Sequence, residues 1–365
     1  MFRSEEKEEV FNLVRKLIDR KAWELFELVP YLQIIANKRK YATMYITSNH
    51  EDITFNINLD DSGWNGFTYV AKHDEYSLTF KDAMYRQNAI EVHLTRVQGI
   101  SESLKMAIFR LYDYEEYSGF YIYINIREPL GYTPCDIIPK RIPILKKYLI
   151  QILEVYDKIH GTEDETQLLN ETIPTVIEYK LNRKTNIYEL SYRDMPELFP
   201  IFELLGPTEE LERKLKRTKR TDEVLEFDTN FVEIFYKKGT REVAPLLITI
   251  VDRNKGTVLD FYLCDASDNE YEECLTILTR YFLENGRPKL IYIRNFISYL
   301  YLSPFFQTLN IKFDIEVPLK QTSEAIEHLL NTEFKDFVDE NGNGQHYDID
   351  QDDQQDSYDG ETRIV

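Results

Sequence analysis

The chain has 365 residues, 43 % of them hydrophobic, and a formal net charge of −20. This length favours about two or three domains, and the acidity disfavours general binding to nucleic acid or to anionic membrane surfaces. The three cysteines form no CxxC pair, which argues against a disulfide framework.

The first 20 residues form a charged amphipathic pattern. Apolar residues such as Val10, Val14 and Leu17 recur at helical spacing. Such a segment is not a signal peptide, and no apolar run approaches the roughly 20 residues that cross a bilayer. We therefore expect a cytoplasmic protein without membrane contact. Its high aromatic content favours strand faces and core, with an aromatic-rich protein interface as the alternative.

From Tyr41 the hydrophobic period changes to two. YATMYITS (41–48), DITFNINLD (52–60) and GFTYVAKH (66–73) predict successive strands of an antiparallel meander. Further segments are expected in this order: a helix near 80–88, strands near 89–97 and 119–126, a Pro-rich loop at 129–143 and an amphipathic helix at 142–160. Together they predict an α+β domain over residues 1–160.

Residues 161–220 are interpreted as a bridging segment. IPTVIEYKLN (173–182) and TNIYELSYRD (185–194) predict a strand pair. Helices are expected at 195–205 and 207–220, and the second ends in a basic run at 213–220. A solvated helix end whose cations complement the helix dipole explains this run better than a nucleic-acid patch, because no aromatic residues are interleaved.

The segment 221–332 carries the clearest pattern. VLEFDTNFVEIFY (224–236), PLLITIVD (245–252) and TVLDFYLCD (257–265) predict three strands, with Gly256 available for a turn with positive φ. Helices and strands then alternate: 269–286, 287–295, 297–310, 311–317 and 322–338. Thr322 or Ser323 can cap the last helix. The resulting order, βββαβαβα, is that of an RNase H-like sheet.

Local sequence in this segment adds to the pattern. EFDTNF places Asp228 on the first strand, and LLITIVD ends the second strand with Asp252 before a turn. With the element order, these residues resemble the catalytic core of retroviral-type integrases and DDE transposases. The resemblance implies the fold of that core but not its catalytic triad; Asp228, Asp252 and Glu324 are the candidate carboxylates for a divalent-metal site (Mg²⁺ or Mn²⁺). Arg294 stands where that family has its second catalytic Asp, and an arginine there would repel the cation that converging carboxylates hold.

Two functional hypotheses follow from this resemblance. The first is a non-catalytic interaction protein built on a degenerate RNase H-like domain, with a protein as its partner. The alternative is a divalent-metal-dependent phosphodiesterase or nuclease that uses Asp228, Asp252 and Glu324. The stretch GRPKLIYIRN also resembles a family of uncharacterised bacterial proteins, and residues 20–155 resemble a domain of unknown function that precedes it in that family.

The remaining motifs are weak. No HExxH pattern occurs, so a zinc site is not expected. Neither a GxGxxG nor a P-loop pattern occurs, so nucleotide binding through such loops is not expected, and no GxSxG pattern places a serine nucleophile. The buried packing role common for free cysteines is expected for Cys264 and Cys274. The histidines are interpreted as scattered surface or loop residues; they are His50, His73, His93, His160, His328 and His346.

Residues 333–365 carry eleven acidic and two basic residues, and we expect a disordered acidic tail. DENGNGQHYDID (339–350) partly matches a calcium loop, in which oxygen donors alternate and a glycine makes the sharp turn. The ligands of such a Ca²⁺ site would be Asp339, Asn341, Asn343, Gln345 and Asp350. His346 and the aspartate at the last position depart from that pattern, so a tail without bound calcium is favoured.

Overall fold

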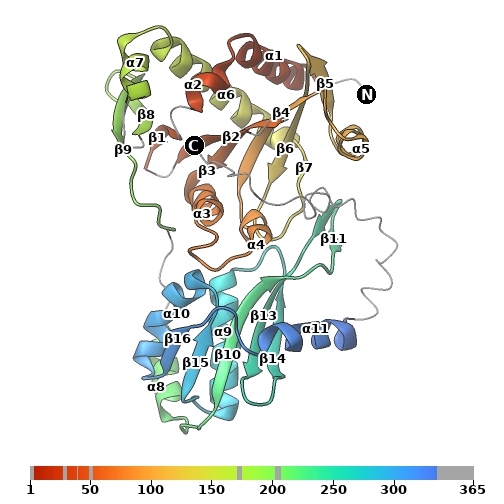
Figure 1. Ribbon diagram of the computed structural model, residues 1–365. Helices are drawn as coiled ribbons and strands as arrows, with labels where there is room; N and C mark the ends of the chain where they lie inside the picture. The colour runs from red at the N-terminus through yellow and green to blue at the C-terminus, as the bar shows by residue number, and fades with distance from the viewer. Residues whose placement is uncertain are drawn as a thin grey trace.

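The computed structural model describes residues 4–27, 31–38, 40–48, 52–170, 175–201 and 207–334. The chain is mixed α/β and contains a nine-stranded sheet, a five-stranded sheet and a two-stranded hairpin. The larger sheet lies in the N-terminal half and the smaller one in the C-terminal half (Figure 1). None of the helices in the described ranges has the length and apolarity needed to cross a membrane. The calcium loop predicted at 339–350 lies outside the described residues.

The N-terminal sheet has the strand order β5-β6-β4-β3-β2-β1-β8-β9, and β7 pairs with β6. Its strands are β1 (Tyr31–Asn37), β2 (Lys40–Ser48), β3 (Asp52–Leu59), β4 (Ala89–Arg96), β5 (Tyr114–Tyr117), β6 (Phe120–Arg127), β7 (Cys135–Asp136), β8 (Thr175–Asn182) and β9 (Ile187–Asp194). All neighbours are antiparallel except β1 and β8. The strand pair expected in the bridging segment is therefore present, but its strands extend the N-terminal sheet.

Helices cover the two faces of this sheet differently. Three of them, α1 (Glu5–Asp19), α2 (Ala22–Phe26) and α6 (Ile142–Ile159), contribute to one apolar cluster with Phe55, Val92 and other alternate strand residues. On the opposite face, α3 (Asp60–Ala71) packs Trp64 and Phe67 against aromatic strand residues. The remaining helices of this half are α4 (Phe80–Met84), α5 (Glu102–Leu111), η1 (Pro139–Arg141) and α7 (Glu163–Asn170).

The strand predicted at 66–73 is wrong, because these residues belong mostly to helix α3. Two glycines allow this helix to lie directly on the backbone of its neighbours. A Cβ atom on Gly63 would lie 2.6 Å from the carbonyl carbon of Asn58, and one on Gly66 would lie 2.7 Å from Cα of Gln87. This tertiary contact overrides the strand propensity of the aromatic and β-branched residues.

The helix predicted at 195–205 is not present in its described part, residues 195–201. Backbone groups of this segment are bound by side chains of the α3 region instead. Trp64 Nε1 donates to the carbonyl of Phe199 at 2.9 Å, and the Tyr76 hydroxyl donates to that of Leu198 at 3.1 Å. These bonds hold the segment extended along α3.

The C-terminal sheet has the strand order β14-β13-β10-β15-β16. Its elements follow the predicted succession: β10 (Val224–Phe231), β13 (Leu246–Asp252), β14 (Thr257–Cys264), α9 (Glu270–Asn285), β15 (Leu290–Ile293), α10 (Phe296–Thr308), β16 (Lys312–Ile315) and α11 (Thr322–Glu333). Helix α8 (Glu209–Arg217) precedes them, and an unpredicted hairpin, β11 (Tyr236–Lys238) and β12 (Arg241–Val243), follows β10. Gly256 has the expected positive φ, 67°.

The two halves share a hydrophobic cluster. Tyr76, Leu78 and Ala83 of the N-terminal half are buried in the cluster that contains Phe227 and Phe305 of the C-terminal half. The backbones also meet, since the amide of Ala244 donates to the carbonyl of Gly131 at 2.8 Å. A Cβ atom on Gly131 would lie 1.9 Å from the carbonyl oxygen of Ala244, so only glycine fits there.

Candidate functional site

The central strand β10 has one apolar and one acidic face. Side chains alternate along a strand, so Leu225 and Phe227 point into the core while Glu226 and Asp228 share the other face. Asp228 is 4 % exposed. Its carboxylate accepts hydrogen bonds from the Thr229 amide at 2.9 Å and from Asn230 Nδ2 at 2.7 Å. The carboxylate is thus held rigidly by its own strand.

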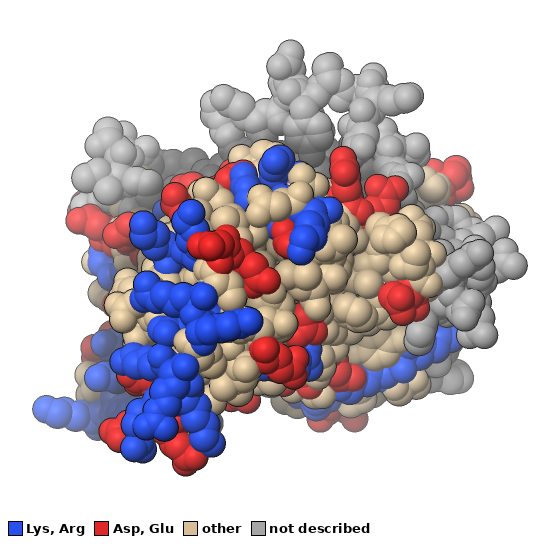
Figure 2. Space-filling model, turned by 90° about the horizontal axis from the view of Figure 1, so that it is seen from below, with Lys and Arg blue, Asp and Glu red and all other residues tan. Residues whose placement is uncertain are grey.

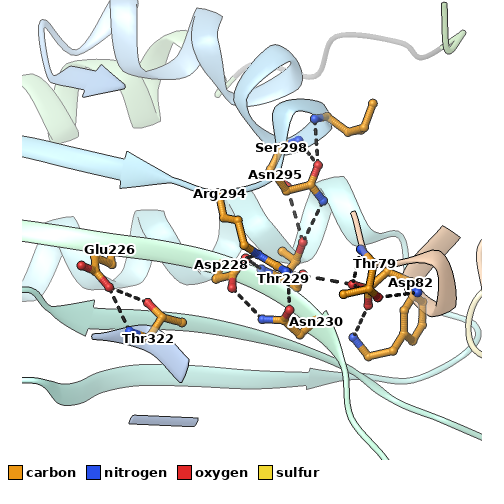
Figure 3. A network of polar contacts seen from close by, with 12 residues as sticks. Thr79, Asp82, Glu226, Asp228, Thr229, Asn230, Arg294, Asn295, Ser298 and Thr322 are labelled. Atoms are coloured by element: carbon orange, nitrogen blue, oxygen red, sulfur yellow. Dashed lines mark hydrogen bonds and ion pairs between the residues drawn. The ribbon is translucent and has the colours of Figure 1, made fainter. Parts of the chain in front are cut away.

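Arg294 forms an ion pair with the carboxylate of Asp228. Strand β15 runs parallel to β10 with Ile293 opposite Phe227, which brings the next residue beside Asp228. Arg294 Nε donates to Asp228 Oδ1 at 3.1 Å, and the guanidinium also donates to the carbonyl of Thr229 at 3.3 Å. Burial raises the pKa of Asp228, and the Arg294 charge opposes that rise. Figure 3 shows the Arg294 side chain extending from the end of β15 to the Asp228 carboxylate.

A second carboxylate approaches Arg294 from the N-terminal half. Asp82 belongs to the capping box that begins α4 with Thr79. Its Oδ1 accepts the backbone amide of Phe231 at 3.1 Å, and its Oδ2 lies 3.9 Å from a terminal nitrogen of Arg294. The side chains of Asp82 and Asp228 are both about nine-tenths buried or more. The ion-pair network of Asp82, Arg294 and Asp228 therefore joins the two halves (Figure 3).

The two residues after Arg294 are also structural. Asn295 caps α10, because its Oδ1 accepts the backbone amides of Ile297 at 2.8 Å and Ser298 at 3.4 Å. Phe296 stacks on Tyr76 of the N-terminal half with ring centroids 5.7 Å apart. Asn295 and Phe296, which follow β15, therefore make contacts that stabilise the fold.

Glu226 holds the start of α11, a role that sequence reasoning missed. Its fully buried carboxylate accepts hydrogen bonds from the amides of Lys320, Gln321 and Thr322 at 2.9–3.0 Å and from the Thr322 hydroxyl at 2.8 Å. A terminal guanidinium nitrogen of Arg253 lies 3.1 Å from Glu226 Oε1 and neutralises the charge of this carboxylate. The prediction that Thr322 or Ser323 caps this helix is wrong: its N-cap is Gln321, which makes no side-chain cap bond.

The other predicted carboxylates have different positions. Asp252 pairs with Leu225 across the sheet, so it projects toward the face opposite Asp228, and its Oδ1 accepts the amides of Asn254 at 2.8 Å and Lys255 at 3.1 Å. Glu324 is exposed in the first turn of α11. Within the described ranges, no group of three or more His, Cys, Asp or Glu side chains is placed to hold a metal ion.

A second polar cluster lies on the N-terminal sheet around His93, on β4. The interpretation of this residue as a surface or loop histidine is wrong, since its side chain is 12 % exposed. Its Nδ1 lies 3.5 Å from Asp52 Oδ2, and its Nε2 lies 3.4 Å from Glu91 Oε2. The ring stacks on Tyr123 at 4.5 Å. The cluster depends on strand register, which the sequence pattern does not show.

Neighbouring charges determine the ionisation of this cluster. Burial alone would lower the pKa of His93, but Asp52 and Glu91 raise it to about 9. Burial opposes ionisation of Glu91 as well, yet Arg127 and His93 lower its pKa to about 2. The imidazolium and both carboxylates are therefore charged at neutral pH. As expected from the sequence, Cys264 and Cys274 are buried.

A match to a protein family lies in the C-terminal half of the chain. Residues 211–330 match a protein family described as a domain of unknown function, DUF6930. No curated protein matches the chain.

Among solved structures, a chain of the simian T-cell lymphotropic virus intasome in complex with PP2A regulatory subunit B56 gamma is 18 % identical, with 36 % of this chain and 46 % of that chain covered and a TM-score of 0.25. The alignment thus spans less than half of that chain. The magnesium complex of the HTLV-2 integrase catalytic core domain, in its trimeric form, is 20 % identical, with 33 % and 76 % covered and a TM-score of 0.24.

Proposed function

We propose that the protein is a non-catalytic interaction protein built on an RNase H-like domain. In this domain Asp228, on the central strand, stabilises the fold through its ion pair with Arg294. The contact between Arg294 and Asp228 carries this proposal. A divalent cation at Asp228 would have to displace the guanidinium and remain close to its positive charge. Displacement would also leave Asp82 without its partner in the network.

A cleavage assay tests the non-catalytic role. DNA and RNA oligonucleotides, single-stranded and duplex, are incubated with Mn²⁺ or Mg²⁺ and with wild type or the variant Asp228→Asn. We expect both proteins to give the background rate of the metal alone, because Asp228 is engaged by Arg294. Metal-dependent cleavage by wild type that is lost in a folded Asp228→Asn variant would restore the nuclease hypothesis.

A basic surface on the C-terminal half offers a site for a partner. We name it the basic patch; its exposed residues are Arg213, Lys214, Lys216, Arg217, Lys219, Arg220, Lys289 and Lys312. The first six follow one another on and after α8, while Lys289 and Lys312 lie at the starts of β15 and β16, which pair with each other. Figure 2 shows Lys and Arg side chains gathered on the left, the side on which Figure 1 places α8 and β16.

Arg287 assembles the basic patch from these separate segments. Its terminal nitrogens donate to the carbonyls of Lys216 at 2.9 Å, Thr218 at 3.1 Å and Leu309 at 3.0 Å. Arg287 is 9 % exposed, and no carboxylate within the described ranges forms an ion pair with it. Its charge therefore adds to the positive potential of the patch.

The partner that fits this surface is an acidic protein segment. The patch is a local positive region on a chain of net charge −20, so a long nucleic-acid duplex would extend from it over repulsive surface. A short acidic segment can match the patch without meeting that surface. Complementary charge of this kind supplies specificity and fast association.

Poly-L-glutamate is a suitable probe for the basic patch. We expect fluorescently labelled poly-L-glutamate to bind wild type in a salt-dependent manner, and the double variant Lys219→Glu/Lys312→Glu to bind at least about tenfold more weakly. Lys147→Glu/Lys184→Glu is the matched control, because it changes the net charge equally at exposed residues outside the patch. Equal weakening in both variants, or tighter binding of a labelled DNA duplex than of poly-L-glutamate, would refute an acidic protein partner.

A further inference from the structure

A cleft of about 900 Å³ opens at the β9 side of the N-terminal sheet, apart from the Asp228 network and the basic patch. Residues of β1, β8 and β9 line it, together with Trp64 of α3 and residues of the segment after β9. This volume lies in the range of small-molecule sites, roughly 300–1,000 Å³. The cleft has no counterpart among the motifs that the sequence analysis considered.

Much of the lining is apolar and held in place. Ile35 comes from β1, and Pro196 and Ile201 come from the segment after β9. Trp64 is 8 % exposed, and its Nε1 donates a hydrogen bond to the carbonyl of Phe199, so the ring has a fixed orientation. Phe67 packs against it with ring centroids 5.7 Å apart. A preformed apolar wall of this type favours a ligand with an aromatic or aliphatic body.

The charged residues of the lining are all cations. They are Lys38, Lys180, Arg183 and Arg193, and the lining includes neither aspartate nor glutamate. Arg193 is oriented by Glu178 at 2.5 Å and by Gln33 Oε1 at 2.7 Å. The other three are exposed, and no ion pair to a described carboxylate holds any of them. In a chain of net charge −20, such a concentration of unpaired cations at an apolar cleft indicates an anionic ligand.

We propose that this cleft binds a small organic anion with an apolar, aromatic body. A carboxylate, sulfonate or phosphate group of the ligand would lie against Lys180, Arg183 and Lys38, and its body would pack on Trp64 and the apolar strand residues. Charge-assisted hydrogen bonds to lysine and arginine supply the recognition of the anionic group. The site is independent of the basic patch, since its residues come from the opposite half of the chain.

Titration with 8-anilinonaphthalene-1-sulfonate, an aromatic sulfonate whose fluorescence rises in apolar sites, tests this proposal. We expect one binding site per folded chain, with quenching of Trp64 fluorescence by energy transfer in a Trp23→Phe background. The variant Lys180→Glu/Arg183→Glu should bind at least about tenfold more weakly, because two attractive charges become repulsive. Lys184→Glu is the control, since this exposed neighbour of Arg183 is not part of the lining.

A neutral probe of the same shape separates the contribution of the anion from that of the apolar body. N-phenyl-1-naphthylamine lacks the sulfonate, and we expect it to bind at least about tenfold more weakly and to be insensitive to Lys180→Glu/Arg183→Glu. Equal affinity of the two probes for wild type would overturn the proposal. Unchanged sulfonate binding by the double variant, or binding of many equivalents per chain, would also overturn it.

Discussion

Replacing Arg294 with methionine should lower the free energy of unfolding by about 3–5 kcal/mol, the usual cost of leaving a buried ion pair with one partner. Methionine keeps the apolar length of the side chain but removes the donors to Asp228 and to the Thr229 carbonyl. It also leaves two buried carboxylates, Asp82 and Asp228, without their shared cation. Urea unfolding, followed by circular dichroism and by tryptophan fluorescence, measures the loss.

A double-mutant cycle identifies the charge as the cause. Asp228→Asn in the Arg294→Met background removes one of the two uncompensated charges, so we expect it to recover part of the lost stability. Arg280→Met is the matched control, because Arg280 also pairs with an aspartate, Asp260, but its side chain is 45 % exposed. We expect a loss of less than about 1 kcal/mol there. Similar losses at positions 294 and 280 would contradict the structural role of the network.

The stability of the protein should fall as the pH rises from about 6.5 to 9, because His93 loses its proton over this range. A histidine whose pKa is raised on folding stabilises the folded state fully below its unfolded pKa and ceases to do so above its folded pKa. The shift from 6.5 to about 9 corresponds to roughly 3 kcal/mol. On the acid side, the lowered pKa of Glu91 predicts a loss as the pH falls from 4.5 toward 2.

The variant His93→Gln provides the comparison for this pH dependence. Glutamine remains neutral, so the stability difference between wild type and variant should be largest at pH 6 and should decline by about 3 kcal/mol at pH 10. Urea midpoints measured at intervals of one pH unit give this difference directly. A difference that stays constant from pH 6 to pH 10 would show that His93 is not protonated in the folded protein.

The fold was predictable from the sequence where local patterns determine an element, and it was not predictable where contacts with other segments determine it. The C-terminal order was predictable because local signals such as Gly256 and Gly286 separate its strands and helices. The error at 66–73 arose because Gly63 and Gly66 act through contacts with Asn58 and Gln87, which a local pattern does not include. Strand β1 was missed although it lies between β2 and β8 in the sheet.

The candidate site was only partly predictable for a related reason. The position of Arg294 relative to Asp228 follows from strand order, and the resemblance of the sequence to integrase cores indicated it. Asp82 could not be identified in this way, since it is 149 residues from the amide of Phe231 that it accepts. Glu226 was missed because helix capping was sought next to α11. When the partner of a buried charge lies far along the sequence, it can be identified only from the three-dimensional structure.

The hydrophobic cluster shared by the two halves extends beyond the segment that the family match covers. The family match covers residues 211–330, yet Tyr76, Leu78 and Ala83 complete the core of that segment. A substitution at Phe296 is therefore constrained by the ring of Tyr76, which lies 220 positions earlier and outside the matched segment. Residues 211–330 alone would therefore expose the apolar surface that Tyr76, Leu78 and Ala83 cover in the whole chain.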